Sequence, residues 1–404
     1  MRLSRWAGIF NQPRTSNSET VPIQPDTGRF QGSGGNMEAS TDVFVIGGGP
    51  AGLAAAIAAR EKGFQVIVAD GGRPPIDKAC GEGLLPDALA AIRRLGVVME
   101  KSDGYAFRGI RFHDGTTSVE ADFPNGNGVG VRRKVLHQKM VERAQDCGVS
   151  FLWNAPVTGI TAKGVLVGGA EVPARWIVGA DGSRSRLRRW SRLEAHTQLD
   201  QRYAYRRHYR LEPWTDCMEI YWGKDTQAYV TPVSEQEVCI ALVSRRSSDR
   251  LDETLREFPR LHSRIKSAEP ASTERGAITA MHRLRRVCRG NVALIGDASG
   301  SVDAITGEGL CLSFRQATVL ADALEAGELS RYEMAHRRLF KRPTVMGNLM
   351  LLLDRRPRLR ERALRGMEAS PDVFARMVAI HVGATSRRHM AATGALLGWR
   401  FLTA

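Results

Sequence analysis

Apolar and polar positions near the start of the chain change from one period to another. Two short apolar runs, Val43–Ile46 and Gln65–Ala69, enclose a segment, Leu53–Lys62, whose apolar residues recur at helical spacing. We predict a strand, a tight turn, a helix and a second strand. Strands that alternate with helices are typical of an α/β domain with a parallel sheet.

The turn between the first strand and the helix is rich in glycine. Gly47 permits the turn, Gly49 lets the backbone approach a pyrophosphate, and Gly52 lets helix and strand pack closely. The N–H groups at the start of the helix then point at the phosphates. The second strand ends at Asp70, whose carboxylate can accept hydrogen bonds from an adenosine ribose. The spacing predicts dinucleotide binding, and a glycine-rich turn in an unrelated α/β domain is the alternative.

Three later motifs narrow the type of dinucleotide. The segment 176–188 reads as a strand that runs into an Asp-Gly-x-x-Ser-x-x-Arg turn beginning at Asp181. The run 292–298 is a further strand that ends in Gly296-Asp297. A helix is predicted from Arg133, with Leu136 three residues later.

In this order, the motifs resemble the flavoprotein superfamily of p-hydroxybenzoate hydroxylase, the single-component class A monooxygenases and the geranylgeranyl reductases. The resemblance runs from Asp42 to about Leu324. It implies a Rossmann-like FAD-binding domain of the glutathione reductase type, an antiparallel substrate sheet and a helical C-terminus. It places Asp297 on the ribityl chain and Arg133 beside the diphosphate. The cofactor-binding residues expected from the motifs and the resemblance are Gly47, Gly49, Pro50, Ala51, Gly52, Asp70, Gly71, Arg73, Cys80, Gly81, Gly83, Leu84, Arg133, Val157, Asp181, Gly296, Asp297, Gly307, Gly309 and Leu310.

Two loops are expected to flank the flavin ring. The stretch 77–86 resembles the Lys-Pro-Cys-Gly-Gly-Gly-Leu stretch of geranylgeranyl reductases, with Ala79 and Glu82 as departures. Cys80 is therefore a catalytic candidate, and a small buried packing residue is the alternative. A helix from Gly307 is expected to aim its N-terminus at the flavin. The alternative for Thr306 and for Glu308 is that each acts only as a helix N-terminal residue.

The middle of the chain predicts strands at 203–209, 218–222, 227–231 and 237–243, in an antiparallel sheet with one covered face. In the resembling family, such a sheet roofs the flavin ring. Tyr229 and His208 are the catalytic candidates there. Core packing is the alternative for Tyr229, and we interpret His208 as a surface histidine.

The domain organisation follows from these elements. We predict a disordered extension over 1–40, with Met37 as an alternative start. The FAD-binding domain takes 41–105, 130–195 and 286–330, the substrate domain 106–129 and 196–285, and a helical segment 331–404. We expect Pro343 and Pro357 to break the last helices, which pack on the FAD domain. Contact of their apolar and basic residues with an anionic membrane is the alternative.

Charge and cysteine content add little to this interpretation. The formal net charge of +15 comes largely from arginine pairs, without a nucleic-acid-binding motif, so no nucleic acid partner is expected. The six cysteines are scattered, which predicts a reducing, cytoplasmic setting and no metal. No apolar run is long enough to span a bilayer.

The sequence thus predicts an FAD-dependent oxidoreductase. Its first interpretation is an NAD(P)H-dependent monooxygenase that hydroxylates an aromatic or polyketide/lipid-type molecule through a flavin C4a-hydroperoxide. Its second is a geranylgeranyl-reductase-like enzyme that saturates isoprenoid double bonds. A non-catalytic flavin-binding or nucleic-acid-binding protein is the alternative of another class. A second glycine-rich nucleotide motif is missing from the sequence, so NAD(P)H is expected to dock transiently. The oligomeric state stays open.

Overall fold

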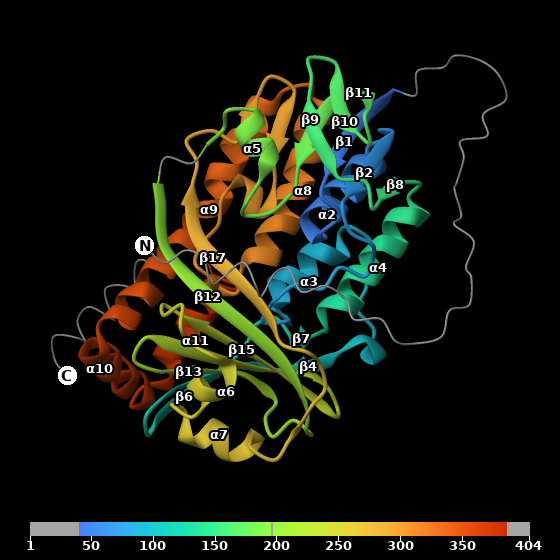
Figure 1. Cartoon of the computed structure of the whole chain (residues 1–404). Helices are drawn as coiled ribbons and strands as arrows, with labels where there is room; N and C mark the ends of the chain where they lie inside the picture. The colour runs from blue at the N-terminus through green and yellow to red at the C-terminus, as the bar shows by residue number, and fades with distance from the viewer. Residues whose placement is uncertain (1–39, 195–196, 386–404) are drawn as a thin grey trace, which may run out of the picture. The chain divides into compact units, whose positions relative to one another are not determined.

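The first sheet of the molecule is built around the predicted glycine turn. The computed structural model describes residues 40–194 and 197–385, and its elements are labelled in Figure 1. The strand order is β18-β19-β11-β1-β2-β8, with β10 and β9 added beside β11. The strands are β1 (Thr41–Ile46), β2 (Val66–Asp70), β8 (Ser150–Trp153), β9 (Val157–Ile160), β10 (Gly164–Val167), β11 (Ala170–Gly179), β18 (Cys288–Arg289) and β19 (Val292–Leu294).

The pairing in this sheet brings the predicted motifs to one edge. β1 runs parallel to β2 and β11, and β11 runs parallel to β19. The carboxyl ends of these four strands therefore lie together, and each is followed by a predicted motif. Apolar side chains of the sheet and its covering helices form one core cluster. The helices of this part are α2 (Pro50–Glu61), α3 (Pro86–Arg93), α4 (Arg133–Asp146), α5 (Arg186–Trp190) and α8 (Gly309–Glu325).

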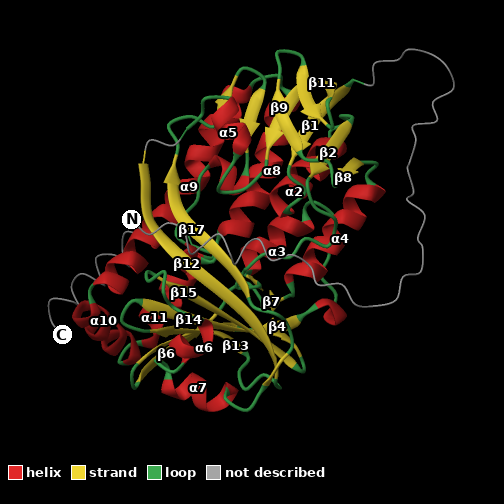
Figure 2. Ribbon diagram, viewed as in Figure 1, coloured by secondary structure: helices red, strands yellow, loops and turns green. Residues whose placement is uncertain are grey.

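A second sheet, predicted to form the substrate domain, is drawn below the first in Figure 2. Its order is β16-β12-β15-β14-β13-β5-β6, with β17 paired to β12. All its pairs are antiparallel except β5 with β13, which are parallel. The strands are β5 (Gly109–Asp114), β6 (Thr117–Asp122), β12 (Thr197–Arg210), β13 (Cys217–Trp222), β14 (Thr226–Ser234), β15 (Glu237–Ser244), β16 (Glu269–Pro270) and β17 (Arg275–Arg283). A small third sheet contains β3 (Gly83–Leu84), β7 (Gly128–Gly130) and β4 (Tyr105–Phe107).

The two faces of the second sheet are covered differently. α6 (Leu251–Leu255) and α7 (Pro259–Ile265) share an apolar cluster with the outer face. The inner face shares its cluster with three C-terminal helices, α9 (Leu329–Arg355), α10 (Pro357–Glu368) and α11 (Pro371–His381). Alternation along each strand separates the two sets of side chains.

The C-terminal helices correct two expectations. α9 continues through Pro343, which the sequence predicted as a break, whereas Pro357 does begin a new helix. A proline inside a helix costs about 3 kcal/mol, and the packing of α9 on α8 and on the second sheet offsets that cost. In addition, α10 and α11 pack on β6 of the second sheet rather than on the FAD-binding part. The alternative prediction was membrane contact through two segments, 349–353 and 395–399. Most side chains of 349–353 are buried, and 395–399 lies outside the described residues.

The predicted fold class is confirmed: a Rossmann-like α/β domain is joined to a second sheet and to a helical C-terminus. Within the described residues, no helix is long and apolar enough to cross a membrane.

Candidate functional site

A large cavity lies where the carboxyl ends of the first sheet meet the inner face of the second. Its volume is about 630 Å³. Most of the residues expected to bind a cofactor line it: Gly47, Gly49, Pro50, Ala51, Asp70, Gly71, Cys80, Gly81, Gly83, Arg133, Val157, Asp181, Asp297, Gly307, Gly309 and Leu310. The fold thus brings together segments that are far apart in the sequence.

Four expected residues do not line this cavity. Gly52, Leu84 and Gly296 are buried behind its wall, and Arg73 is exposed outside it. Gly52 contributes instead by close packing, because a Cβ atom there would lie 1.9 Å from the Gly47 carbonyl oxygen.

The glycine turn leaves the start of α2 open to the cavity. Gly47 has a φ of +110°, and a Cβ atom there would lie 2.5 Å from the Ala180 oxygen. No heavy atom lies within 4 Å of the position that a Cβ of Gly49 would take. The N-cap of α2 is Gly49, which has no side chain to cap the helix. The first N–H groups of the helix are therefore available to an anion such as a diphosphate.

The Asp70 carboxylate is fixed beside this turn. One oxygen accepts a hydrogen bond from the Gly48 N–H at 2.7 Å and the other from the Gly72 N–H at 2.7 Å. Each oxygen keeps a lone pair for a further donor, as binding of a ribose requires.

His137, which sequence reasoning missed, supports the same turn from α4. Its Nε2 lies 2.8 Å from the Gly48 oxygen, and its Nδ1 lies 3.4 Å from the Ile76 nitrogen. A neutral ring that donates from Nε2 and accepts at Nδ1 satisfies both contacts. Burial lowers the pKa of His137, which favours this neutral form. The sequence offered one signal for His137, namely its position directly after Leu136 in the predicted helix.

Two charged side chains keep unused bonding capacity beside the cavity. Arg133, the first residue of α4, has an Nε atom with no hydrogen-bond partner among the described residues. Asp181 accepts from the Arg186 and Leu187 N–H groups through Oδ2, while its Oδ1 has no partner in the same part of the chain. An open helix N-terminus and a free guanidinium nitrogen in the wall of one cavity fit a dinucleotide diphosphate.

Asp297 sits in a 3₁₀ turn, Gly296–Ser299, directly after β19. Its side chain is 44% exposed, and its Oδ2 lies 3.5 Å from Lys78 Nζ. The carboxylate thus faces the cavity with only one long ionic contact, so it remains able to accept hydrogen bonds from a hydroxylated chain.

A buried polar cluster holds the loop that contains Cys80. Glu82 has a φ of 59°, is 3% exposed, and accepts from the Arg133 N–H at 2.9 Å. Its other oxygen lies 2.5 Å from His208 Nε2. The interpretation of His208 as a surface histidine is wrong, because its side chain is 1% exposed. The contact of His208 with Glu82, which is distant in the sequence, helps to bury the histidine. The alternation of side chains within the strand could not reveal this contact.

The tautomer of His208 follows from its neighbours. Arg132, Arg206 and Ser272 place donor atoms 2.8–3.3 Å from His208 Nδ1. Guanidinium groups only donate, so Nδ1 accepts and Nε2 carries the hydrogen toward Glu82. Cys239 completes a trio of possible metal ligands within 4.8 Å. Two adjacent guanidinium groups disfavour a cation there, and burial raises the pKa of the Cys239 thiol.

The other two catalytic candidates do line the cavity. Cys80 is half-buried, and its sulfur accepts a hydrogen bond from the Glu82 N–H at 3.4 Å. Tyr229 donates its hydroxyl hydrogen to Gln227 Oε1 at 2.9 Å, and burial raises its pKa. The phenol therefore stays protonated, with its hydrogen directed away from a substrate.

A small apolar pocket of about 50 Å³ opens beside the large cavity. The two share Gly83, Met218, Tyr229, Thr306 and Gly307. The pocket is otherwise lined mainly by apolar side chains of the second sheet and of the C-terminal helices, among them Phe112, Ile220, Met346, Met350, Phe374 and Met377. Methionine side chains adapt easily to an apolar ligand.

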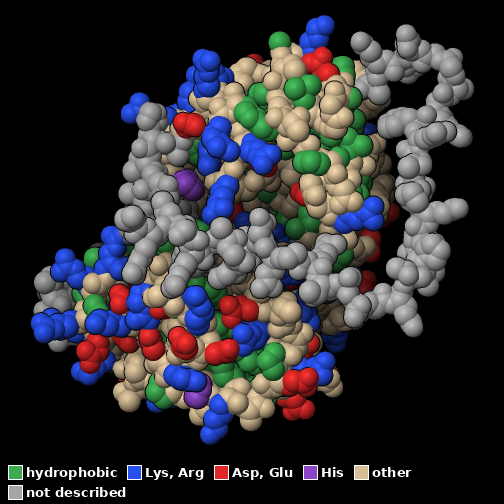
Figure 3. Space-filling model, viewed as in Figure 1, with side chains coloured by type: hydrophobic (Ala, Val, Ile, Leu, Met, Phe, Trp, Pro, Cys, Tyr) green, Lys and Arg blue, Asp and Glu red, His purple; other side chains and the backbone are tan. Residues whose placement is uncertain are grey.

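Figure 3 shows Lys and Arg side chains beside the hollow in the middle of one face, and acidic side chains among basic ones over the lower part. Many of the arginines are engaged in ion pairs, such as Arg108 with Glu120 and Arg207 with Asp252.

Known proteins share both the sequence and the fold. A family model described as "FAD binding domain" matches residues 40–330. Menaquinone reductase of Mycobacterium tuberculosis is 28% identical over 324 residues, 73% of this chain and 79% of that protein. Digeranylgeranylglycerophospholipid reductase 1 of Methanothermobacter thermautotrophicus is 27% identical over 330 residues, 75% of this chain and 81% of that protein.

Solved structures agree on the fold. The flavin-dependent brominase Bmp2 has a TM-score of 0.74 and 20% identity, covering 85% of this chain and 94% of that one. A geranylgeranyl bacteriochlorophyll reductase-like protein of Thermoplasma acidophilum has a TM-score of 0.68 and 19% identity, covering 88% and 95%. With the family match over most of its length, the chain belongs to the FAD-binding-domain family, and it is an FAD-dependent oxidoreductase.

Proposed function

We propose that this oxidoreductase saturates carbon–carbon double bonds in an apolar, polyprenyl-type substrate. The observation that carries the proposal is the methionine-rich pocket that opens beside the large cavity. Gly83 of the Cys80 loop and Thr306 and Gly307 before α8 line both spaces. An apolar chain seated in the pocket would therefore end between the two loops expected to flank the flavin.

FAD is the cofactor that the large cavity fits. The N-terminus of α2 and Arg133 would hold the diphosphate, Asp70 the adenosine ribose, and Asp297 the ribityl chain. Bound FAD supplies redox chemistry, which in the reduced state is the transfer of a hydride. The protein's own part is to orient the apolar substrate and to exclude water from the pocket.

NAD(P)H is proposed as a transient electron donor. The described residues contain one glycine-rich turn after a parallel strand, and α2 follows it. A nicotinamide donor would therefore approach the open side of the large cavity rather than a second nucleotide fold.

The names of two relatives support the choice of reaction. One is called a menaquinone reductase and the other a digeranylgeranylglycerophospholipid reductase. Both names describe reductases, and both compounds carry isoprenoid chains. This agreement moves our second interpretation of the sequence ahead of the first.

Monooxygenation of an aromatic or polyketide-type molecule remains the second candidate. Tyr205 and Tyr229 both line the large cavity, and their rings could pack against a planar substrate. A putative FAD-dependent monooxygenase of Bacillus subtilis, YetM, is 24% identical over 316 residues, 70% of this chain and 84% of that protein.

One experiment separates the two reactions. The FAD-loaded protein is incubated with NAD(P)H and either a polyprenyl quinone or a polyprenyl glycerolipid, with and without O2, and the products are analysed by mass spectrometry. The proposal expects a product heavier by two hydrogen atoms in both atmospheres, with both atoms located on the polyprenyl chain by fragmentation. A product that appears only with O2 and carries an added oxygen atom would establish the monooxygenase instead.

A further inference from the structure

A buried ion cluster lies behind the two cavities and joins α3, α8, α9 and α11. Arg342 of α9 donates to Asp87 at 3.0 Å and to Glu308 Oε1 at 2.8 Å. The side chains of Asp87 and Glu308 are 7% and 1% exposed. Arg315 also donates to Asp87, at 3.1 Å. Two guanidinium groups thus face two carboxylates in this cluster.

Glu308 does not perform the role that its position in the sequence suggests. It is the N-cap residue of α8, yet its side chain makes no capping hydrogen bond. Its Oε2 has no hydrogen-bond partner among the described residues, and the same holds for Nδ1 of His381. These two atoms face each other at 3.9 Å. An unpaired buried polar atom destabilises a fold, so stability alone does not explain the arrangement.

The pair lies where the two cavities meet. Glu308 lines the large cavity, directly after the shared residues Thr306 and Gly307. His381, the last residue of α11, lines the small apolar pocket. No other histidine of the described residues lines the large cavity or the small pocket. Asp87 Oδ1 also lacks a partner, but Asp87 lines neither cavity.

We propose that Glu308 and His381 form an acid–base pair for the reduction, an inference that rests on the proposed function. Glu308 Oε2 would accept the hydrogen of His381 Nδ1, which leaves Nε2 as the nitrogen that faces the apolar pocket. A carboxylate in this place fixes the tautomer of an imidazole and stabilises the imidazolium. Hydrogen bonds of this kind are often long before a substrate binds.

Saturation of a double bond needs a hydride and a proton, and the pair supplies the proton. The hydride comes from the reduced cofactor and joins one carbon. His381 enters the step as the imidazolium, protonated at both ring nitrogens. The π electron pair of the double bond forms the new C–H bond at the other carbon as the His381 Nε2–H bond breaks, which leaves a neutral ring with its hydrogen on Nδ1. His381 then regains a proton from water. Two electrons and two hydrogen nuclei enter the substrate, so the step balances.

The other candidates are less suited to this step. The Tyr229 hydroxyl directs its hydrogen to Gln227. Both nitrogens of His208 contact other side chains, and His208 lines neither cavity. Cys80 remains as a second candidate, since its sulfur accepts only a long bond from the Glu82 N–H among the contacts of the described chain.

The test compares this pair with a matched pair elsewhere in the chain. His113 Nε2 lies 3.7 Å from Glu219 Oε1, and the two side chains are 12% and 2% exposed. Neither residue lines the large cavity or the small apolar pocket. FAD-loaded wild type, His381→Asn, His381→Gln, Glu308→Gln and the control His113→Asn are compared in single turnovers in deuterated water, with FAD content and melting temperature measured alongside.

We expect the His381 variants to lose about 10²-fold or more in turnover, with FAD content and melting temperature close to wild type. The wild-type product should carry solvent deuterium on the carbon that receives the proton. The control His113→Asn should change turnover by no more than a small factor. Wild-type turnover in both folded His381 variants would overturn the proposal.

A second readout does not depend on activity. ¹⁵N NMR of histidine-labelled, FAD-loaded protein should show His381 protonated at Nδ1, and Glu308→Gln should change that signal, while the signal of His137 stays in place. A ring protonated only at Nε2 in the wild type would overturn the acid–base pair. If the pair behaves as expected but no polyprenyl substrate is reduced, then the proposed function fails and not the geometry.

Discussion

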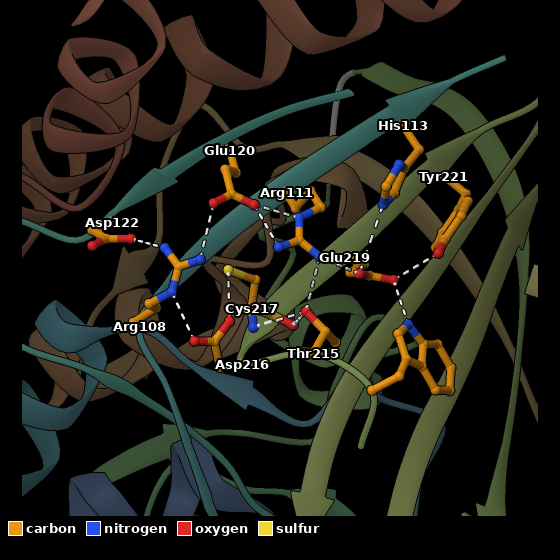
Figure 4. Close-up of polar contacts among 11 residues, drawn as sticks. Arg108, Arg111, His113, Glu120, Asp122, Thr215, Asp216, Cys217, Glu219 and Tyr221 are labelled. Carbon is orange, nitrogen blue, oxygen red and sulfur yellow. Dashed lines mark hydrogen bonds and ion pairs between the residues drawn. The ribbon is translucent and has the colours of Figure 1, made fainter. Parts of the chain in front are cut away.

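Two of the glutamate–histidine pairs, Glu219–His113 on the outer face of the second sheet and Glu308–His381 at the cavities, differ in how the carboxylate is satisfied. On the outer face, Glu219 accepts from Arg111 at 2.9 Å, Tyr221 at 2.6 Å and Trp214 at 3.0 Å, as Figure 4 shows in part. At the cavities, Glu308 accepts from Arg342 through one oxygen, and its other oxygen has no partner in the described chain.

The rings of His113 and His381 also have different surroundings. His113 stacks on the ring of Tyr221, with ring centroids 4.4 Å apart. His381 instead lines a pocket. Burial alone would raise the pKa of Glu219, but the surrounding His113, Tyr221 and Trp214 side chains lower it to about 2. A fully satisfied carboxylate thus indicates a structural role, whereas an incompletely satisfied one beside a cavity indicates chemistry.

The largest expected difference between the two pairs is the loss of stability when the Glu219 carboxylate is removed. Glu219→Ala leaves Arg111, Trp214 and Tyr221 without their shared acceptor, so it should lower the free energy of unfolding by about 3–5 kcal/mol. Glu308→Ala should cost less, because Arg342 keeps Asp87 as a partner. Urea unfolding of the FAD-loaded variants measures both. Equal losses of stability would mean that the two carboxylates play the same role.

Acid should separate the two glutamates as well. The pKa of Glu219 is lowered from 4.5 to about 2 in the folded state. Its contribution to stability is therefore present above the unfolded value and is lost as the pH falls from 4.5 toward 2. That contribution is about 3 kcal/mol at 1.36 kcal/mol per pKa unit. Glu219→Gln should flatten the dependence of unfolding on pH in this window, and an unchanged slope would contradict the assignment.

A smaller effect is expected at the cofactor. Asp297→Ala should remove a charge-assisted hydrogen bond to the ribityl chain, worth about 1.5–3 kcal/mol. FAD affinity should fall by roughly one to two decades, as measured by titration of the apoprotein. Asp372→Ala is the control, since Asp372 is exposed on α11 and pairs with Arg376. Unchanged affinity in Asp297→Ala would show that this carboxylate does not hold the cofactor.

The smallest effect is expected at Cys80. If the thiol mainly packs against its loop, Cys80→Ser should leave the flavin spectrum intact and change turnover by no more than a small factor. A fall of about 10²-fold or more, with FAD retained, would instead assign the proton to Cys80. In that outcome Cys80, and not His381, would donate the proton to the substrate.

The sequence was informative where function follows local motifs. Gly47, Asp70 and Asp297 lie at the ends of parallel strands, and parallel pairing alone brings such ends to one edge. Arg133 was predicted from the pattern of the helix that it begins, and it lines the large cavity. Each of these predictions needed only a strand, a turn and the residue that follows.

Sequence reasoning failed where distant segments meet. Glu308 and His381 are brought together only when α11 folds back, and local patterns gave Glu308 the role of a helix N-terminal residue. Likewise, His208 appeared exposed because nothing near it in the strand reveals Glu82. Pro343 was predicted as a break because its local cost is visible in the sequence, whereas the packing that offsets this cost is not.

The central claim is that bound FAD passes its electrons to an apolar double bond and does not require O2. The most direct test reduces the FAD-loaded protein under anaerobic conditions and then adds a polyprenyl quinone while the flavin absorbance is recorded. We predict that the oxidised flavin spectrum returns without O2 and that fragmentation in the mass spectrometer places the two added hydrogen atoms on carbons of the polyprenyl chain rather than on the quinone oxygens. A flavin that stays reduced with every polyprenyl substrate until O2 is admitted would contradict the account.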